Sequence, residues 1–353
     1  MNKIHRSNLQ PNFRSMEPGD GPKLVTLFRE NPDNGRIAIS PLYQIDPYQA
    51  IQIQHPTSCG LVAETQEKIV GFGLVRFGVC QVNGEERPYA WLNSLMVDSA
   101  YRQQGLGKEL ALRRVALARE RVGEHGLILT SVQSQNTASL AIAQKWAGEQ
   151  IGQLQSVLMK TSNKAPTSTG GFQVREAESD ELSLVADRLN EFYADYALYE
   201  PQSADSLAVW LDQSVGGEPI NKCFVALNAQ QEIVAGLMLS QQHRLMAMQV
   251  ERLPNAIHLL NRLVKMVPLD NTLRQMAVSK IWHQPGHQQV AQMLWQTIRW
   301  QSRTWGSHLT CFYAPQSNIP QILQTPKWLP KASFAVLAQG RLTDKKVNSV
   351  YPL

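Results

Sequence analysis

Cysteine is scarce in this chain of 353 residues, and no cysteine is placed for a metal site. The chain has no Cys-x-x-Cys pair and no Cys/His array with zinc spacing. Its four cysteines are Cys59, Cys80, Cys223 and Cys311. We therefore expect buried thiols in a reducing compartment, without a disulfide framework and without a bound metal.

Long apolar runs are also missing. The first residues, MNKIHRSNLQPNF, lack the apolar stretch of a signal peptide. No segment is long and apolar enough to span a bilayer. We expect a cytoplasmic protein that does not enter a membrane.

Charge is neither abundant nor clustered. Charged residues make up 18% of the chain and the formal net charge is +5, with the basic residues scattered. A nucleic-acid-binding protein gathers such residues into a stripe or patch, so the sequence disfavours that class. The small basic excess fits a solvated surface or a small polyanionic ligand.

A segment rich in Ser, Thr, Gly and Pro, Thr161 to Gly171, divides the chain into nearly equal halves. Its composition and its lack of apolar periodicity are typical of a linker. Since 353 residues exceed one ordinary core, two domains are expected. The predicted division is a domain at 1–162, a linker at 163–171, a domain at 172–340 and a tail at 341–353.

The two halves resemble each other in short aligned segments. Gly60 to Val75 and Cys223 to Leu239 each consist of an apolar strand, a polar turn and a second apolar strand, which predicts a β-hairpin in each half. Val62 pairs with Val225 and Ile69 with Ile233, at offsets of 163 and 164. Arg102 pairs with His283 and Thr130 with Thr310, at offsets of 181 and 180. One insertion in the second half, within Gln241 to Asp270, explains why the offset increases from 164 to 181. Two steady offsets favour duplication over chance apolar similarity.

Strands and helices alternate in both halves, which predicts an α/β layered fold with helices flanking a mixed central sheet in each of two tandem domains. The elements expected in the first half are strands at 13–16, 60–75 (the hairpin), 89–98, 127–132 and 153–159, and helices at 22–30, 105–122 and 137–147. Those expected in the second half are strands at 172–175, 223–239 (the hairpin), 273–282 and 309–313, and helices at 180–196 and 287–305.

The strongest chemical signal lies where the strand ending at Val97 or Asp98 turns into a helix. Arg102-Gln103-Gln104-Gly105-Leu106-Gly107 opens that helix. A helix start offers unpaired N–H groups and the positive end of the helix dipole. Two glycines let a ligand approach the backbone, so this turn is suited to a pyrophosphate.

Other phosphate motifs fail at particular residues. A nucleotide P-loop needs a glycine where Arg102 stands and Ser or Thr where Glu109 stands. A dinucleotide fingerprint needs a third glycine where Leu110 stands. A turn whose glycines serve geometry alone is the remaining alternative.

The residues around this turn resemble the GNAT acetyltransferase superfamily. Leu95-Met96-Val97-Asp98-x-x-Tyr101-Arg102-x-x-Gly105-Leu106-Gly107 contains the family's Arg/Gln-x-x-Gly-x-Gly/Ala signature after the fourth strand. The likeness extends more loosely over Phe13 to Lys160. It implies that acetyl-coenzyme A is the co-substrate.

The resemblance also implies roles for single residues. Backbone groups of Leu95 and Val97, with Met96 between them, would pair with the pantetheine arm as an added strand does. Backbone N–H groups of Gln103, Gln104, Gly105, Leu106, Gly107 and Lys108 would hold the pyrophosphate. Arg102 would add a charge-assisted contact. Asn136 matches a family Asn that contacts the cofactor, and a plain helix N-cap is an equal alternative.

The catalytic residues are less well defined. Ala143 stands where many members of this family carry a Tyr that protonates the departing thiolate, with Trp146 nearby. Glu64 and Asp98 are the candidates for a general base, acting through water. Each also has a purely structural alternative. Asn93 is expected on the same face of its strand as Leu95.

In the second half the corresponding turn, His283-Gln284-Pro285-Gly286-His287-Gln288, keeps one glycine, and Pro285 removes an N–H donor. The resemblance therefore implies a tandem GNAT chain whose degenerate second domain has lost cofactor binding. The expected activity is direct attack of an acceptor amine on the thioester of acetyl-coenzyme A. The alternative is a non-catalytic acyl-coenzyme A sensor or interaction module. The acceptor (small molecule, protein N-terminus or lysine) and homodimer formation stay open.

Overall fold

The computed structural model describes residues 11–34, 38–66, 68–166, 171–254, 261, 265–340 and 349–352. The first half contains, in chain order, β1 (Asn12–Ser15), α1 (Gly21–Glu30), β2 (Asp33–Asn34), β3 (Ala38–Tyr43), α2 (Pro47–Gln54), β4 (Ser58–Glu64), β5 (Ile69–Val82), β6 (Glu85–Val97), α3 (Leu106–Val122), β7 (Leu127–Gln133), α4 (Thr137–Ala143) and β8 (Glu149–Lys160). The alternation confirms the predicted α/β class. The predicted helix at 137–147 is shorter, since α4 ends at Ala143.

The second half repeats this succession. Its elements are β9 (Gln173–Glu176), α5 (Leu182–Phe192), α6 (Ala204–Leu211), β10 (Ser214–Val215), β11 (Glu218–Pro219), β12 (Asn221–Leu227), β13 (Ile233–Ser240), β14 (Met246–Arg252), β15 (Thr272–Leu273), β16 (Gln275–His283), α8 (Gln288–Gln301), β17 (His308–Tyr313), α9 (Ile319–Leu323) and β18 (Lys331–Gln339). The predicted linker bears no helix or strand at 161–166, and its residues 167–170 lie outside the described residues.

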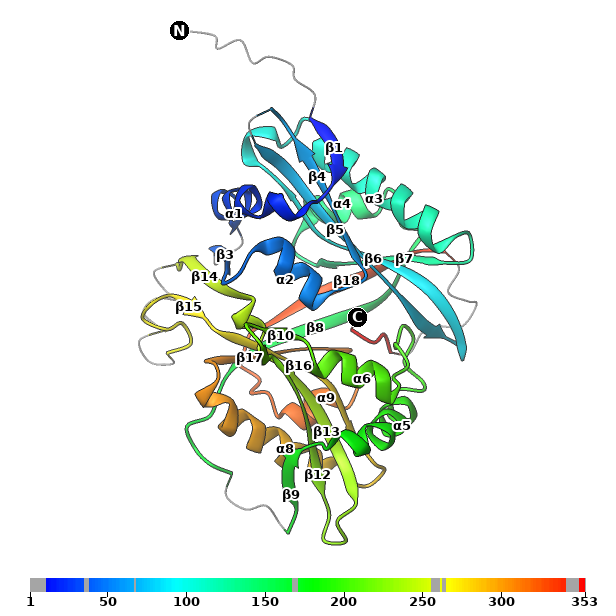
Figure 1. Cartoon of the computed structure of the whole chain (residues 1–353), viewed down its shortest axis with the longest axis vertical. Coiled ribbons are helices and arrows are strands. Elements are labelled where there is room, and N and C mark those ends of the chain that lie inside the picture. The colour runs from blue at the N-terminus through cyan, green and yellow to red at the C-terminus, as the bar shows by residue number, and fades with distance from the viewer. Residues whose placement is uncertain are drawn as a thin grey trace.

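Twelve strands of both halves form one continuous sheet, in the order β1-β4-β5-β6-β7-β18-β8-β17-β16-β13-β12-β9. The last strand of each half lies inside the other half. β18 pairs with β7, and β8 pairs with β17, both antiparallel. Figure 1 shows β18 and β8 side by side at the junction of the two halves. Because of this exchange, neither half completes its sheet with its own strands.

Helices cover both faces of the sheet. In the first half, α1 buries Leu24, Leu27 and Phe28 against one face. α3 buries Leu106 and Leu110 against the other. In the second half, α5 and α6 cover one face, and α8 and α9 cover the other (Figure 1). This layering places the start of α3 at the end of β6, where the cofactor turn is predicted.

The inserted segment of the second half reaches the first half. β14 pairs antiparallel with β3, from Met246 opposite Tyr43 to Val250 opposite Ile39. With β15 and β2 they form a second, four-stranded sheet. Neither β3 nor β14 is among the strands predicted from the sequence, because each is stabilised by a partner from the other half.

The hairpins of the two halves share a register and a bulge. The bulge lies between Ala63 and Glu64 in β4 and between Ala226 and Leu227 in β12. Ala63 lies opposite Gly71, and Ala226 lies opposite Ala235. These pairs reproduce the predicted offsets of 163 and 164.

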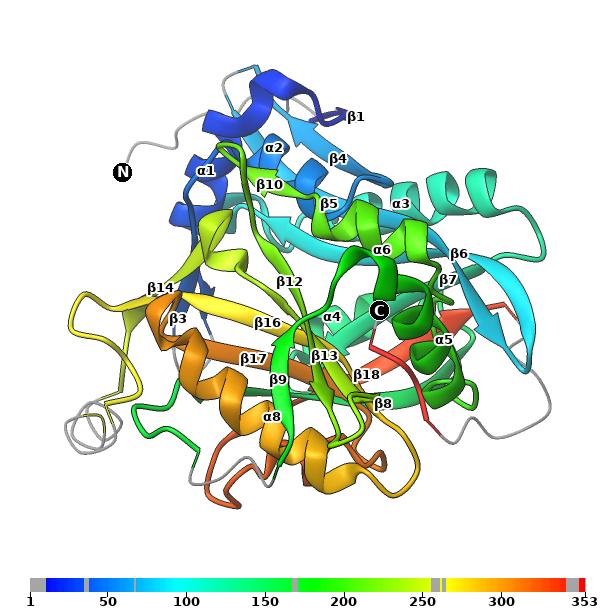
Figure 2. The ribbon, with the colours of Figure 1, turned by 60° about the horizontal axis from the view of Figure 1, so that its bottom comes forward.

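Residues of the segment predicted as a tail lie in the core. Val350 and Tyr351 are buried, and Ala197 pairs with Val350 in a β-bridge. The C-terminal residues lie between the two halves in Figure 2. Residues 341–348 of this segment are outside the described residues.

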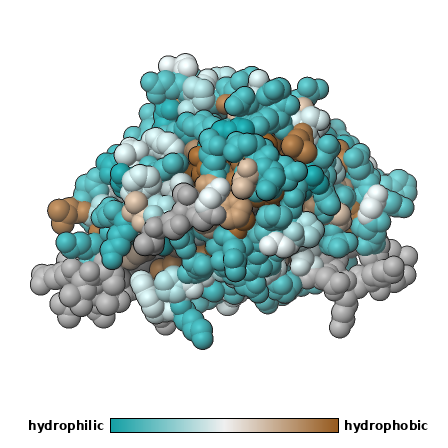
Figure 3. Space-filling model, turned by 90° about the horizontal axis from the view of Figure 1, so that it is seen from below, coloured by the Kyte–Doolittle hydropathy of each residue, from teal (hydrophilic) through white to brown (hydrophobic). Residues whose placement is uncertain are grey.

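The face seen from below is largely hydrophilic, with an apolar area near its middle and smaller apolar spots toward its edges (Figure 3). Among the helices that the structure describes, none combines the length and apolar content needed to cross a bilayer. The four cysteines are free thiols, three of them buried.

Candidate functional site

The sheet opens between β6 and β7. These parallel strands pair at only three positions, ending with Trp91 opposite Leu129. The Oγ1 of Thr130 then donates a hydrogen bond to the carbonyl of Leu92 at 2.7 Å. Beyond this point β7 pairs only with β18, so the edge of β6 from Asn93 to Val97 is open toward β7. The result is a V-shaped gap closed at Leu92 and Thr130.

A β-bulge shapes the open edge of β6. Phe72 lies opposite Met96, whereas Leu74 lies opposite Asn93, so β6 has one extra residue here. Ser94 lies in this bulge and has a φ of +52°, in the left-handed region. Because opposite residues share a face, Asn93 is on the face of Leu74, and Leu95 is on the face of α3. The prediction that Asn93 and Leu95 share a face is therefore wrong.

The turn from β6 to α3 exposes a row of N–H groups. The N–H groups of Asp98, Ser99, Ala100, Tyr101 and Arg102 have partners within the turn and its neighbours. Those from Gln103 to Lys108 have none in the described part of the chain, and the next bond runs from Glu109 to the carbonyl of Gly105. Positive φ angles at Gln103 and Gly105, +61° and +86°, fold the turn. Six successive free donors at a helix start suit a phosphate anion, and its binding at this turn stays a prediction.

Gly105 is glycine for two reasons. Its φ of +86° disfavours any other residue. A Cβ built on it would meet no protein atom within 4 Å, so a side chain there would extend into open space beside the turn. A Cβ on Gly107 would make only ordinary contacts, with Val97 and Ile142. Packing of the protein alone therefore does not demand glycine at position 107.

The side chain of Arg102 supports the turn from within. Its Nε donates to the carbonyl of Val97 at 3.0 Å, and its Nη2 lies 3.5 Å from the Oδ1 of Asn31. Asn31 also receives the N–H of Ser99 at 2.7 Å. The structure thus shows Arg102 bracing the end of β6. A phosphate contact by its guanidinium stays a prediction.

A cleft of about 600 Å³, counting its open mouth, follows the gap between β6 and β7. Leu95 lines one wall and Asn136 the opposite wall. Asn136 caps α4 by accepting the N–H of Ser139 at 3.1 Å, as the N-cap alternative predicts. Ala143 and Trp146 line the same wall, so the position where the family's Tyr is expected is part of the cleft.

Two polar side chains in the cleft lack partners. The Oδ1 of Asn93 is buried without a hydrogen bond. The Nε of Arg114, on α3, is likewise buried without one. Buried polar atoms normally have partners, so two unpartnered atoms on residues that line one cleft mark it as a candidate binding site. Arg114 is not among the site residues predicted from the sequence. Its signal is the apolar face of the same helix, marked by Leu106, Leu110 and Ala118, on which a charge is unexpected.

The structure places Glu64 and Asp98 away from this lining. Hydrogen bonds from Arg14 and Lys23 lower the pKa of Glu64. Asp98 is buried, which alone would raise its pKa, but bonds from Lys68 and the N–H of Ala100 lower it. Each carboxylate thus has a structural role and is held ionised by its partners. Neither is among the residues that line the cleft.

The second half has a shorter turn. Ala235 lies opposite His283 just as Gly71 lies opposite Val97, so His283 occupies the place of Val97 in the sheet. The predicted pairing of His283 with Arg102 is therefore wrong. Four residues connect β16 to α8, against eight between β6 and α3. The halves thus differ by an insertion before β16 and a deletion after it.

The shorter turn offers fewer free donors. Pro285 has no N–H, and the N–H of His287 is bonded to the carbonyl of Gln284 at 3.0 Å. The row of donors is therefore interrupted. His283 and His287 bond to backbone carbonyls through their Nδ1 atoms.

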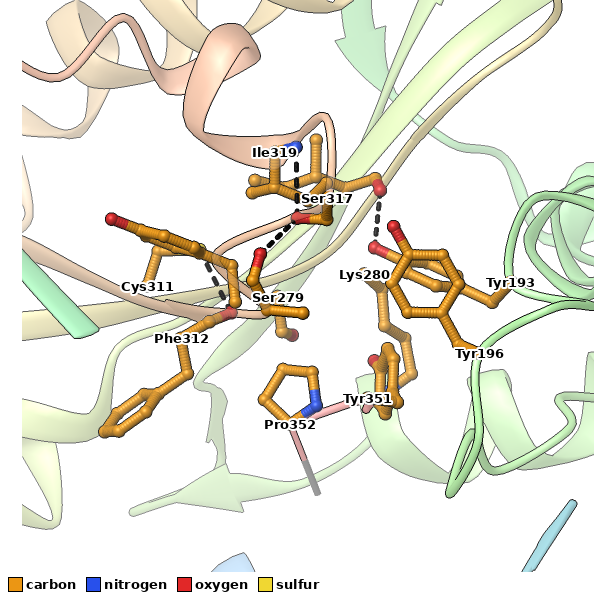
Figure 4. Close-up of a pocket in the computed structure, with 13 residues that line it drawn as sticks. Tyr193, Tyr196, Ser279, Lys280, Cys311, Phe312, Ser317, Ile319, Tyr351 and Pro352 are labelled. Carbon is orange, nitrogen blue, oxygen red and sulfur yellow. Dashed lines mark hydrogen bonds between the residues drawn. The ribbon is translucent and has the colours of Figure 1, made fainter. Parts of the chain in front are cut away.

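The gap between β16 and β17 holds a smaller pocket of about 330 Å³, counting its open space, lined by both strands and by the chain end (Figure 4). Tyr193 donates its hydroxyl to the carbonyl of Ile281 at 2.6 Å. Ile281 stands where Leu95 stands in the first half, two residues before the end of its strand. Tyr351 and Pro352 occupy the same gap. The backbone edge that is open in the first half is thus satisfied internally in the second.

Comparisons with known proteins agree with the predicted family and fold. Residues 25–148 match the model of the Acetyltransferase (GNAT) family. No curated protein matches the chain in sequence. Two solved structures of Saccharomyces cerevisiae N-myristoyltransferase with bound myristoyl-CoA are similar in fold, each with a TM-score of 0.65. One is 9% identical over 93% of this chain and 78% of that chain, and the other is 10% identical over 100% and 88%.

A third similar structure is a GCN5-related N-acetyltransferase from Kribbella flavida. It has a TM-score of 0.52 and 11% identity over 94% of this chain and 72% of that chain. At these identities the likeness concerns the fold, which extends across both halves.

Proposed function

We propose that this chain transfers a short acyl group, acetyl in the simplest case, from coenzyme A to an amine. Its first half is a GNAT acetyltransferase domain, and the chain is an acyltransferase. The observation that carries the proposal is the row of six unpartnered N–H groups from Gln103 to Lys108, which follows a strand whose open edge lines a cleft. A pyrophosphate at these donors would direct the pantetheine arm along Leu95 and Val97.

The chemistry is direct acyl transfer. The nitrogen of a neutral amine attacks the thioester carbonyl, the new C–N bond forms, and the C–S bond breaks. The amine proton passes to solvent or to the thiolate, and coenzyme A leaves. Holding the two reactants together in one cleft supplies much of the rate.

Asn93 is placed to receive the amine. Its unpartnered Oδ1 is an acceptor, and an attacking amine carries N–H donors. Among the described residues lining the cleft there is no Asp, Glu, His, Tyr or Cys. We therefore propose that the acceptor arrives neutral, so that kcat/KM rises with pH until the amine is fully deprotonated.

Isothermal titration of the full chain with acetyl-coenzyme A tests the binding step. We expect one site per chain with a Kd below about 1 mM, and no binding would overturn the proposal. Release of free thiol with a panel of primary amines then tests turnover. Binding without turnover on any amine of a broad panel would contradict the transferase activity.

A further inference from the structure

Arg114 is a buried cation beside the closed end of the cleft. It lies on α3, two turns after the phosphate-binding turn, and is 4% exposed. Its Nη1 donates to the carbonyl of Asn93 at 2.7 Å and lies 3.4 Å from that of Leu74. These two carbonyls belong to the bulge of β6 and its partner strand, so the guanidinium is anchored beside the bulge.

The positive charge of Arg114 has no counter-charge in the described part of the chain. No carboxylate lies within 4 Å of it, whereas Arg14 is paired with both Asp20 and Glu64. Burial lowers the pKa of Arg114 to about 10, so the group is still protonated at neutral pH. The Nε is buried without a partner. An isolated buried charge is strongly unfavourable unless a partner arrives.

The sheet is built to accommodate this side chain. A Cβ on Gly73 would lie 2.6 Å from the Cδ of Arg114, so glycine at 73 makes the room. In the second half Leu237 takes the place of Gly73, opposite Phe224 as Gly73 is opposite Leu61. Leu237 packs there in an apolar cluster with Leu294 and Trp295 of α8. The buried cation therefore belongs to the half with the open cleft.

The position of Arg114 corresponds to the acyl end of a bound thioester. The phosphate donors lie at the start of α3, and the pantetheine arm would follow the open edge from Val97 to Leu95. Continuing in this direction, the acyl group reaches Asn93 and Leu92, where the hydrogen bond from Thr130 closes the gap. Arg114 and Thr130 both line this end.

We propose that the acyl group is short and ends in a carboxylate, which Arg114 binds. This rests on the proposed function, since it requires a coenzyme A thioester in the cleft. A carboxylate supplies the missing counter-charge and accepts from the unused guanidinium N–H groups. A long alkyl chain would instead leave the cation unpaired against apolar surface. The carboxylate takes no part in the transfer and stays on the product.

The test compares two ligands on the unmodified full chain. Succinyl-coenzyme A and pentanoyl-coenzyme A have chains of similar length and differ in the terminal group. We expect succinyl-coenzyme A to bind about 10- to 100-fold more tightly, the range of one charge-assisted interaction. Equal affinities, with free coenzyme A still binding, would overturn this inference and leave the proposed function intact. Failure of coenzyme A itself to bind would overturn both.

Variants of Arg114 sharpen the result. Arg114→Met keeps an unbranched side chain and removes the charge, so the preference for succinyl over pentanoyl should fall below about threefold. Arg114→Lys keeps the charge and should retain part of the preference. A folded Arg114→Met variant with the full preference would overturn the inference. Should Arg114→Met not fold, the comparison on the unmodified chain still decides.

Discussion

The two strand-to-helix junctions of this protein occupy equivalent places in the two halves and differ in length. In the first half eight residues separate β6 from α3, and six successive N–H groups are unpartnered there. In the second half four residues separate β16 from α8, and a proline and an internal bond interrupt the row. The comparison teaches that an anion site at a helix start depends on the connection before it, and not on the helix alone.

The strand edges beside these junctions differ in the same way. β6 and β16 each have a bulge at a non-glycine residue of positive φ, which is Ser94 at +52° in β6 and Lys280 at +49° in β16. In the first half the edge beyond the bulge is open. In the second half the hydroxyl of Tyr193 bonds to Ile281 on that edge. The first half therefore keeps an open strand edge beside its cleft. In the second half the end of the chain packs at the equivalent gap between β16 and β17.

The largest effect is expected from a side chain that blocks the phosphate donors. Gly105→Glu should weaken coenzyme A binding by more than about 100-fold, because a carboxylate would repel and displace the pyrophosphate. Gly286→Glu is the matched control, with a φ of +82° and equally open surroundings. Titration calorimetry and thermal unfolding of both variants separate binding from backbone strain. Equal loss of binding in both variants would contradict the difference between the junctions.

A smaller effect is expected at the acceptor side of the cleft. Asn93→Leu removes the unpartnered amide and should raise the KM for the amine about tenfold, the value of one hydrogen bond. The Kd for coenzyme A should change little. Ser279→Ala, at the equivalent position of β16, should leave both constants unchanged. Initial rates at varied amine concentration check this, and an unchanged KM in Asn93→Leu would exclude the acceptor role.

Removing the hydroxyl that satisfies the closed edge should cost stability without creating a site. Tyr193→Phe leaves the buried carbonyl of Ile281 without its donor and should lower the free energy of unfolding by about 1–3 kcal/mol. Urea denaturation measures this loss. Calorimetry should still give one coenzyme A per chain, because the phosphate donors of the second half remain interrupted. A stoichiometry of two would show that Tyr193 alone blocks the second cleft.

The smallest catalytic effect is expected from the paired carboxylates. Glu64→Gln and Asp98→Asn should change kcat/KM less than about threefold, and a loss of about 100-fold would indicate that these carboxylates relay a proton.

Bonds from Arg14 and Arg175 lower the pKa values of Glu64 and Glu181. A lowered pKa gives stability that is present above about pH 4 and is lost as the pH falls through the folded-state pKa. Glu64→Gln and Glu181→Gln should therefore be destabilised at pH 7, and less so near pH 3.

Local residue order accounts for much of what was predicted. The apolar alternation of the hairpins and the glycines at 105 and 107 each act over a few residues. They located the strands and the turn. The predicted helix starts agree to within two residues, as with α1 at Gly21–Glu30 against a predicted 22–30, whereas α5 and α8 each end four residues before the predicted 196 and 305. The choice between cofactor contact and N-cap at Asn136 needed coordinates, and the structure shows at least the cap.

The remaining features depend on contacts between segments distant in sequence. Periodicity does not reveal which half β8 and β18 will join, because pairing is chosen by neighbours in the folded sheet. The bulge at Ser94 reverses the alternation that a regular strand predicts, which misplaced Asn93. The sequence offsets did not reveal the deletion after β16. The insertion before β16 is larger, and the offset between Thr130 and Thr310 reports only the sum of the two changes.

The sequence alone located the turn at which a phosphate is proposed to bind, because N–H groups at a helix start and glycine conformations are set within one short segment. Only the tertiary structure decided what lies beyond that turn. The strand exchange joins the halves, Tyr193 bonds to the edge of β16 in the second half, and Gly73 leaves room for Arg114 beside the cleft of the first half. Each of these pairs residues that are far apart in the chain, so that packing, rather than local preference, determines the cleft and its charge.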